Sequence, residues 1–106
     1  MNTLFIEQKE FENKLIKLNK LTVKEREKWT KEFVLACHTE LSELLSEVNW
    51  KTHKTKGKRI VLSSIEEEIA DVFIYAINFC LLWQIDSDRI QNVIFNKIQK
   101  NKKRFL

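Results

Sequence analysis

Two stretches of the sequence carry acidic side chains at spacings that could bind a metal ion. The first is HTELSELLSEVNWK, at residues 38–51, and the second is SIEEEIADVFIYAIN, at residues 64–78. In an α-helix, residues three, four or seven positions apart lie on one face. One face of each stretch therefore carries Glu40, Glu43 and Glu47, or Glu68, Asp71, Tyr75 and Asn78. Two helices that turn these faces toward each other would form a cage for a hard divalent cation.

The types of ligand in this cage favour Mg²⁺, with Mn²⁺ as a substitute. Four or five carboxylates without a His or Cys at ligand spacing select a hard cation that prefers oxygen. A ferritin-like di-iron site would need Glu-x-x-His on a helix, whereas His38 lies off the face of Glu40. Because Mg²⁺ keeps some of its water and takes phosphate oxygens as further ligands, the cage predicts phosphoryl chemistry.

A basic loop separates the two acidic stretches, at residues 51–63. It holds Lys51, Lys54 and four further basic or titratable side chains around Gly57. Such a loop can be a solvated surface segment or a clamp for phosphate groups. It leaves directly from the first carboxylate helix, and this position favours the phosphate clamp.

The composition indicates one all-α domain over residues 1–106. The chain has no Pro and one Gly, so almost nothing in it would interrupt a helix. With 43% hydrophobic and 32% charged residues it is globular rather than disordered. The net charge of +4 is mild, and it suits a phosphate-bearing small molecule better than a nucleic-acid partner.

Cysteine usage and hydropathy predict a cytoplasmic protein without a membrane partner. Cys37 and Cys80 lie in apolar helical surroundings, which is typical of buried thiols in a reducing compartment. The segment 1–9 lacks the features of a signal peptide. The longest apolar run, residues 72–83, is too short to span a bilayer.

The first half of the chain predicts two helices, at about 3–19 and from Thr22 to about 50. Thr22 and Glu25 form a capping-box pattern at the start of the second helix. Gln8 interrupts the apolar stripe of the first helix, either as a hydrogen-bonding residue of the bundle or as a ligand contact. The stripe consists of Leu4, Phe5, Phe11, Leu15 and Leu18. In the second helix the carboxylates continue an apolar face made of Trp29, Phe33, Ala36 and Cys37.

The second half predicts a third helix capped by Ser63 or Ser64, and a fourth at about 87–103 that starts at Asp86 or Ser87. Asp71 lies two turns into the third helix among apolar residues, where a lone carboxylate is costly unless it is paired or binds metal. Residues 72–85 are apolar nearly all round, so we expect a four-helix bundle completed by oligomerisation. In the fourth helix we expect Ile90, Ile94 and Ile98 to face inward.

At these residues the sequence resembles the all-α nucleoside triphosphate pyrophosphohydrolases, which include MazG-like proteins, dimeric dUTPases and dCTP pyrophosphatases. Their pattern of Glu-x-x-Glu, a loop and Glu-x-x-Asp matches residues 40–43 and 68–71. Trp50-Lys51 and the run at 71–75 look like the dCTP pyrophosphatase and MazG-like branch. The segment 97–105 looks like the family's closing Lys-x3-Asn-x2-Arg helix. The segment 4–9 and the position of Glu47 look more like the dimeric dUTPases.

The resemblance implies a role for each matching residue. The metal ligands would be Glu40, Glu43, Glu68 and Asp71, with Glu47 as a further ligand or as the residue that orients the water. Lys51, Lys97, Asn101 and Arg104 would hold phosphates. Lys54 is a candidate phosphate contact because of its place in the basic loop and not because of the resemblance. Gln8 would help to read the base, and Trp50 and Tyr75 would pack on the base or sugar, although plain core packing also explains both aromatics.

We therefore expect a Mg²⁺-dependent enzyme, a homodimer or homotetramer, that converts a (deoxy)nucleoside triphosphate to the monophosphate and pyrophosphate. The preferred substrates are dUTP first and dCTP second. One alternative is a broad-specificity housecleaning enzyme for non-standard nucleotides. The other is a non-catalytic helical module whose basic patches bind nucleic acid or protein; it would bind without metal and with a steep salt dependence.

Overall fold

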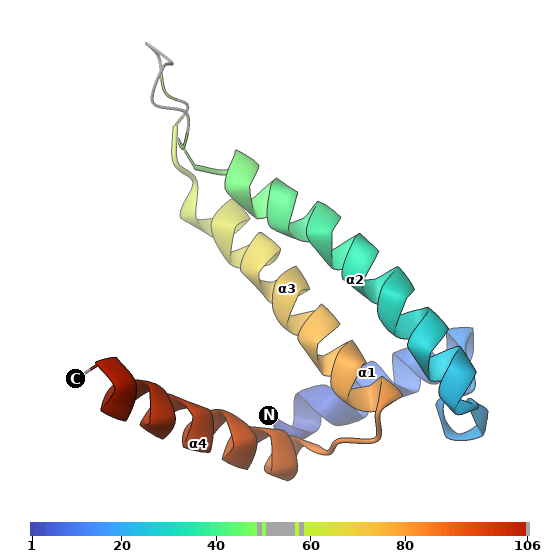
Figure 1. Cartoon of the computed structure of the whole chain (residues 1–106). Helices are drawn as coiled ribbons and strands as arrows, with labels where there is room; N and C mark the ends of the chain where they lie inside the picture. The colour runs from blue at the N-terminus through green and yellow to red at the C-terminus, as the bar shows by residue number, and fades with distance from the viewer. Residues whose placement is uncertain (49, 51–56, 58, 106) are drawn as a thin grey trace.

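The structure is a computed structural model that describes residues 1–48, 50, 57 and 59–105. Within these residues it contains the helices α1 (Asn2–Leu15), α2 (Val23–Ser46), α3 (Leu62–Leu82) and α4 (Ser87–Phe105), and a short 3-10 helix, η1 (Leu18–Lys20). Helices α2 and α3 lie side by side and antiparallel, α1 packs chiefly on α3, and α4 chiefly touches α1 (Figure 1). The predicted all-α fold is confirmed.

The N-terminal part of the chain forms two helices, as predicted, but both end earlier than the predicted residues 19 and 50. Helix α1 ends at Leu15 because the Asn13 side chain accepts a hydrogen bond from the Leu18 backbone N–H (3.2 Å), which offers the backbone an alternative to the helix. The capping box of α2 is confirmed: Thr22 Oγ1 accepts from the Glu25 backbone N–H (3.1 Å), and Glu25 Oε1 accepts from the Thr22 backbone N–H (3.0 Å).

The prediction that Ser63 or Ser64 caps the third helix is wrong. Helix α3 starts earlier, at Leu62, and its N-cap is Val61. The Val61 carbonyl already accepts from the backbone N–H groups of Ser64 (3.1 Å) and Ile65 (3.2 Å), so both serines lie inside the first turn. At α4 the prediction of Asp86 is confirmed, because its Oδ1 accepts from the Arg89 backbone N–H (2.8 Å).

Helix α3 ends in a Schellman motif that redirects the chain. The Ile85 N–H donates to the Cys80 carbonyl (2.9 Å) and the Gln84 N–H donates to the Leu81 carbonyl (3.3 Å). Gln84 occupies the left-handed position of this motif, with φ at 55°. Beyond it α4 leaves at an angle of 113° to α3 instead of returning along it.

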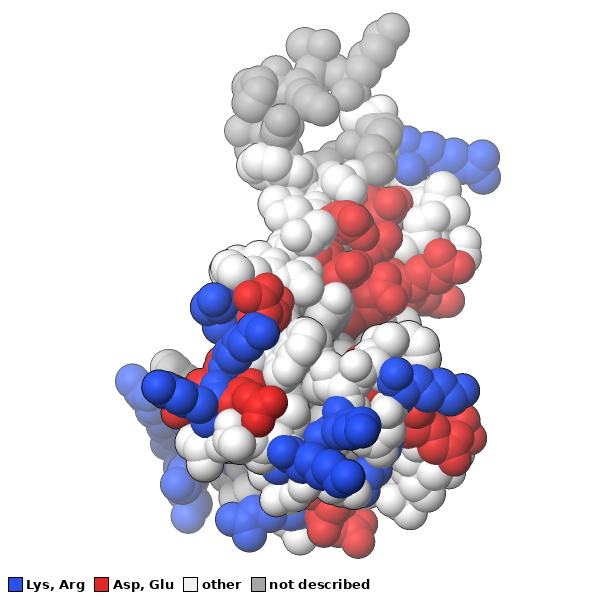
Figure 2. Space-filling model, turned by 90° about the vertical axis from the view of Figure 1, so that its right-hand side faces the viewer, with Lys and Arg blue, Asp and Glu red and all other residues white. Residues whose placement is uncertain are grey.

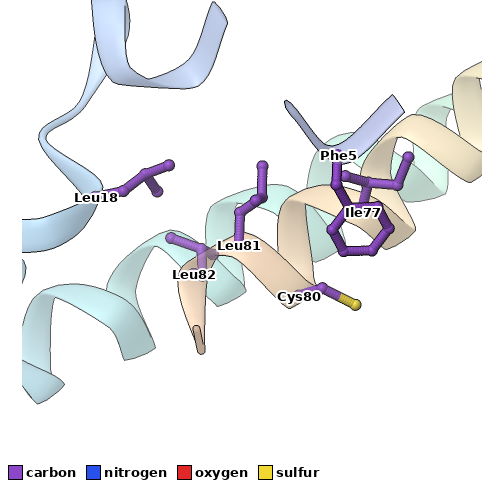
Figure 3. Close-up of a cluster of buried hydrophobic side chains, with 6 residues drawn as sticks. All are labelled: Phe5, Leu18, Ile77, Cys80, Leu81 and Leu82. Atoms are coloured by element: carbon purple, nitrogen blue, oxygen red, sulfur yellow. The ribbon is translucent and has the colours of Figure 1, made fainter. Parts of the chain in front are cut away.

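The core lies at the C-terminal end of α3, where α1, η1 and α2 converge on it. Figure 3 shows its six buried side chains, which are Phe5, Leu18, Ile77, Cys80, Leu81 and Leu82. Buried Arg26 of α2 links α2 to α3 and η1, because its guanidinium donates to the carbonyls of Leu82 and Leu18. A second link between α2 and the end of α3 is the hydrogen bond that Trp83 Nε1 donates to Thr30 Oγ1 (2.9 Å).

Many apolar side chains remain exposed on the single chain, and α4 shows this most clearly. Of the three isoleucines expected to face inward, only Ile90 packs against the core, whereas Ile94 and Ile98 are 49% and 46% exposed. The prediction is wrong for these two because the bend before α4 carries the rest of that helix away from α2 and α3 (Figure 1). The expected stripe of α1 is also largely exposed at Leu4, Phe11 and Leu15.

No single helix among the described residues is long and apolar enough to cross a membrane. Helices α3 and α4 meet the length and composition requirements only as a pair, and their bend of 113° lies within that pair. Burial in the core instead explains why the C-terminal end of α3 is apolar.

Candidate metal centre

Three carboxylates from α2 and α3 converge where the two helices run side by side. Glu40 projects from α2, and Glu68 and Asp71 project from α3; each offers an oxygen, and these oxygens lie within 4.8 Å of one another. Each residue is half-buried. The antiparallel pairing produces this arrangement, because it places the C-terminal half of α2 against the N-terminal half of α3 (Figure 1).

Two oxygens of this acidic triad are buried without a hydrogen-bond partner. They are Oε2 of Glu40 and Oε2 of Glu68, and no Lys or Arg among the described residues forms an ion pair with the triad. A buried polar atom without a partner costs free energy, and a buried carboxylate oxygen costs more than a neutral one. Oxygens in this state are suited to coordinate a cation, so the residues present fit a Mg²⁺ or Mn²⁺ ion.

The electrostatics of the triad also favour a cation. Burial, followed by the charges of Glu43 and Asp71, raises the pKa of Glu40 above its ordinary value. The same causes in the same order raise the pKa of Glu68. Each carboxyl thus resists ionisation in the absence of a positive charge, and a bound divalent ion would reverse this by stabilising the charged form.

Glu43 and Glu47 lie beside the triad. Glu43 is exposed, and its charge contributes to the raised pKa of both Glu40 and Glu68. Glu47 is the C-cap of α2, and its charge acts on Glu68. Figure 2 shows acidic side chains gathered in a patch on this face of the molecule.

Tyr75 lies next to the triad on the same face of α3. Its pKa is raised first by burial and then by the charge of Glu40. Its ring packs edge-on against Phe33, with ring centroids 6.1 Å apart, and Phe33 in turn packs against Trp29 at 5.8 Å. Tyr75 thus both borders the triad and packs against α2.

A second polar cluster lies further along this face of α3 and involves Gln8 of α1. Gln8 Nε2 donates to Asn78 Oδ1 (2.9 Å) and to Glu12 Oε1 (3.3 Å). Asn78 was expected on the carboxylate face but was not assigned a role, and buried Glu12 was missed altogether. The signal that could have identified Glu12 is its position four residues after Gln8, which places the two side chains on one face of α1.

The predicted phosphate ligands of α4 do not meet the triad within one chain. Trp50 is 52% exposed, and Lys51 and Lys54 lie outside the described residues. The other three predicted phosphate ligands are exposed on the C-terminal half of α4, which extends away from α2 and α3 (Figure 1). They are Lys97, Asn101 and Arg104.

Comparison with known proteins adds a match over nearly the whole chain. A protein-family model described as dUTPase matches residues 1–105. Comparisons with the curated proteins and with the solved structures found no match. The family match includes both carboxylate helices, the polar cluster at Gln8 and the basic end of α4.

Proposed function

We propose, on the premise that this chain belongs to the dUTPase family, that it is a Mg²⁺-dependent nucleoside triphosphate pyrophosphohydrolase. The substrates are pyrimidine deoxynucleoside triphosphates, dUTP first and dCTP second, and the products are the monophosphate and pyrophosphate. Mn²⁺ is the expected substitute for Mg²⁺, because both cations bind oxygen-rich sites.

One observation carries this proposal. The acidic triad of Glu40, Glu68 and Asp71 contains two buried oxygens without a partner. A structural salt-bridge network would have supplied these oxygens with Lys or Arg, and a solvated acidic surface would have left them in water. A cation-binding site accounts both for the burial of these oxygens and for their lack of a hydrogen-bond partner.

Each acidic residue has a proposed role in the reaction. Glu40, Glu68 and Asp71 would hold the metal, with Glu43 as a neighbouring ligand. The metal, when bound, supplies positive charge for the phosphate oxygens and lowers the pKa of coordinated water. Glu47, at the end of α2, would be a further ligand or would orient the attacking water by accepting its hydrogen bond.

The substrate would extend from the triad along the polar face of α3. Tyr75 borders the triad and would pack on the sugar, and Gln8, which contacts Asn78 further along this face, would contact the base. Trp50, Lys51 and Lys54 follow α2 in the chain and are proposed contacts for the base and phosphates. Because α4 leads away within one chain, its phosphate ligands would act on the triad of a neighbouring chain.

A homodimer or homotetramer is therefore part of the proposal. The exposed apolar side chains of α4 lie on a helix that has little of its own chain to cover it. A second copy would cover them and complete the bundle. The free thiols Cys37 and Cys80 suit a reducing compartment such as the cytoplasm, and burial raises the pKa of the Cys80 thiol, which suppresses its reactivity.

The direct test is a screen of nucleoside triphosphates with Mg²⁺ that follows pyrophosphate release. We expect the highest kcat/KM with dUTP, the next with dCTP, and no turnover in EDTA. Comparable rates with many non-standard nucleotides would favour the housecleaning alternative. Absence of turnover together with metal-independent, strongly salt-dependent binding of nucleic acid would favour the non-catalytic module.

Variants of the triad test the assignment of the site. Glu40→Gln and Asp71→Asn should each lower kcat by at least about a hundredfold, because loss of a metal ligand removes stabilisation of charge in the transition state. Helical content measured by circular dichroism should not change. Glu66→Gln, an exposed position on α3, is the matched control and should retain parental turnover. Parental turnover in both triad variants would refute the assignment.

A further inference from the structure

In the polar cluster of Gln8, Glu12 and Asn78, the last two residues are more deeply buried than the acidic triad. Glu12 is 6% exposed and Asn78 is 4% exposed, yet the cluster lies at the contact of α1 with α3 and not at the metal centre. No described Lys or Arg forms an ion pair with Glu12. Burial raises the pKa of Glu12, and hydrogen bonding to Asn78 and Gln8 opposes that rise. A carboxyl in this setting is costly unless its hydrogen bonds serve a purpose beyond packing.

The hydrogen bonds of the cluster determine which way the Gln8 amide faces. The amide nitrogen has two hydrogens, and its two acceptors are Asn78 Oδ1 at 2.9 Å and Glu12 Oε1 at 3.3 Å. Both hydrogens are therefore committed within the cluster, and the Gln8 carbonyl oxygen faces outward. If the amide turned over, Gln8 Oε1 would lie against Asn78 Oδ1 and Glu12 Oε1. Contact between these acceptor oxygens is unfavourable, so Glu12 and Asn78 together hold the amide in its observed orientation.

The outward oxygen of Gln8 is available to a ligand. No described residue donates a hydrogen bond to Gln8 Oε1, and the only buried oxygens without a partner in the described part of the chain are those of Glu40 and Glu68. Gln8 Oε1 is thus reached by solvent and presents a hydrogen-bond acceptor. A carboxyl at position 12 can impose this orientation when ionised, because it then accepts and does not donate.

The cluster lies at a suitable distance from the metal centre to contact the far end of a nucleotide. Asn78 follows Asp71 by seven residues on the same face of α3, which corresponds to about 10 Å along the helix axis. Tyr75 lies between them, and after burial the charges of Glu40 and Glu12 are among the causes that raise its pKa. A sugar and a phosphate group would bridge this span, so a base would arrive at Gln8.

We propose that Glu12 is a positioning residue for base selection: it holds the Gln8 amide so that Gln8 Oε1 accepts from the ring N3–H of a uracil base. This inference rests on the proposed function and deepens it. Uracil carries a hydrogen at N3, whereas the N3 of cytosine is an acceptor and would face the Gln8 oxygen without a hydrogen between them. Discrimination between dUTP and dCTP thus depends on Glu12, which itself does not touch the base.

The test compares Glu12→Gln with the parent chain in pyrophosphate release from dUTP and from dCTP. A glutamine at position 12 can donate to Gln8 and allow its amide to turn over. The ratio of kcat/KM for dUTP to that for dCTP should fall by about tenfold or more. The change should come mainly from KM, with kcat for dUTP altered by less than about threefold, because the metal centre is untouched. Glu10→Gln, exposed on the same helix, is the matched control and should keep the parental ratio.

Two further variants show whether Glu12 acts through Gln8. Gln8→Met alone should reduce the ratio to a similar extent, and adding Glu12→Gln to it should have no additional effect. Glu12→Met replaces the carboxyl by an apolar group of similar length, and it provides the same comparison if Glu12→Gln fails to fold. Thermal melting of every variant separates a loss of base selection from a loss of the fold.

The outcomes distinguish this inference from the function on which it rests. A parent chain that neither hydrolyses nor binds dUTP or dCTP would overturn both. A parent chain that prefers dUTP, together with folded Glu12→Gln and Glu12→Met variants that prefer it equally, would overturn this inference alone. Equal loss of kcat with both substrates, at an unchanged ratio, would show that Glu12 has only a structural role.

Discussion

Glu40 and Glu68 face each other across two helices, and each has a carboxylate oxygen that is buried without a partner. Natural proteins usually satisfy such atoms, so the exceptions point to a function. In the absence of metal, neighbouring carboxylates repel one another, which is consistent with the raised pKa values of both residues. We therefore expect the acidic triad to lower the stability of the metal-free fold, and the proposed cation to offset this cost.

This reasoning predicts opposite effects of one substitution with and without metal. In EDTA, Glu68→Gln should melt at a higher temperature than the parent chain, because one repelling charge has been removed. Mg²⁺ should stabilise the parent by about 2.7 kcal/mol at a free concentration of 100 times its Kd, and the variant should lose most of this response. Differential scanning calorimetry in EDTA and over a Mg²⁺ series measures both effects.

Glu66→Gln is the control for that experiment, because it makes the same chemical change on the same helix at an exposed position. It should respond to Mg²⁺ as the parent does. A parent chain whose melting is indifferent to millimolar Mg²⁺ would contradict the metal centre and leave the acidic triad as an unexplained cluster.

At the scale of the elements, the end of α3 decides the direction of α4. The Schellman motif requires a left-handed residue, and Gln84 takes that position with φ at 55°. A residue with a Cβ is strained there, whereas Gly is not. The chain therefore accepts a local cost at the point where α4 turns away from the α2–α3 pair.

Gln84→Gly should stabilise the chain by up to about 1 kcal/mol, since the strain removed exceeds the entropy that Gly adds to the unfolded state. Gln84→Ala removes the same side chain but keeps the Cβ, so it should show no such gain. Urea denaturation of both variants, with the midpoint compared at a constant m-value, makes the measurement. A destabilised glycine variant would mean that the Gln84 side chain contributes more than its backbone costs.

At the scale of the whole molecule, one chain leaves too much apolar surface uncovered. The side chains of α4 include Phe95 and Phe105, which are 61% and 75% exposed, in addition to the two exposed isoleucines. Exposed apolar side chains gathered in this way are typical of interaction surfaces, and we propose that a second copy of the chain covers them. A partner copy would also bring the basic C-terminal end of its α4 toward the acidic triad, with which no described Lys or Arg of the same chain forms an ion pair.

Light scattering at micromolar concentration should therefore give a mass of at least two chains. Ile98→Glu should shift this mass toward the monomer and lower turnover by at least about tenfold, because a charge buried at an interface costs several kcal/mol. Its effect on the single-chain core should be small, since Ile98 is exposed there. Asn96→Glu, an exposed polar position on the same helix, should leave both mass and turnover near parental values. A folded, active monomer would contradict the assembly.

Much of the local structure could be predicted from the sequence, because the signals are local. The absence of Pro, the single Gly and the apolar periodicity predicted an all-α chain, and the capping box at Thr22 and the cap at Asp86 are confirmed. The Glu-x-x-Glu and Glu-x-x-Asp patterns also led to a family resemblance that the dUTPase model confirms over residues 1–105. Side chains three or four residues apart on a helix share a face whatever the tertiary structure, so these inferences needed no packing information.

The tertiary structure decided what depends on contacts between distant segments. Periodicity shows that Ile94 and Ile98 share a face of α4, but the bend after Gln84 determines that this face meets little of its own chain. Likewise, the sequence predicted two carboxylate stripes, whereas the antiparallel packing of α2 and α3 determines which oxygens come within 4.8 Å and which are buried without a partner. The cluster of Gln8, Glu12 and Asn78 joins residues up to 70 positions apart. Burial and hydrogen bonding across such separations arise only when helices pack. The sequence spacing therefore places Glu12 on the same face as Gln8 but does not show that Glu12 is buried against Asn78.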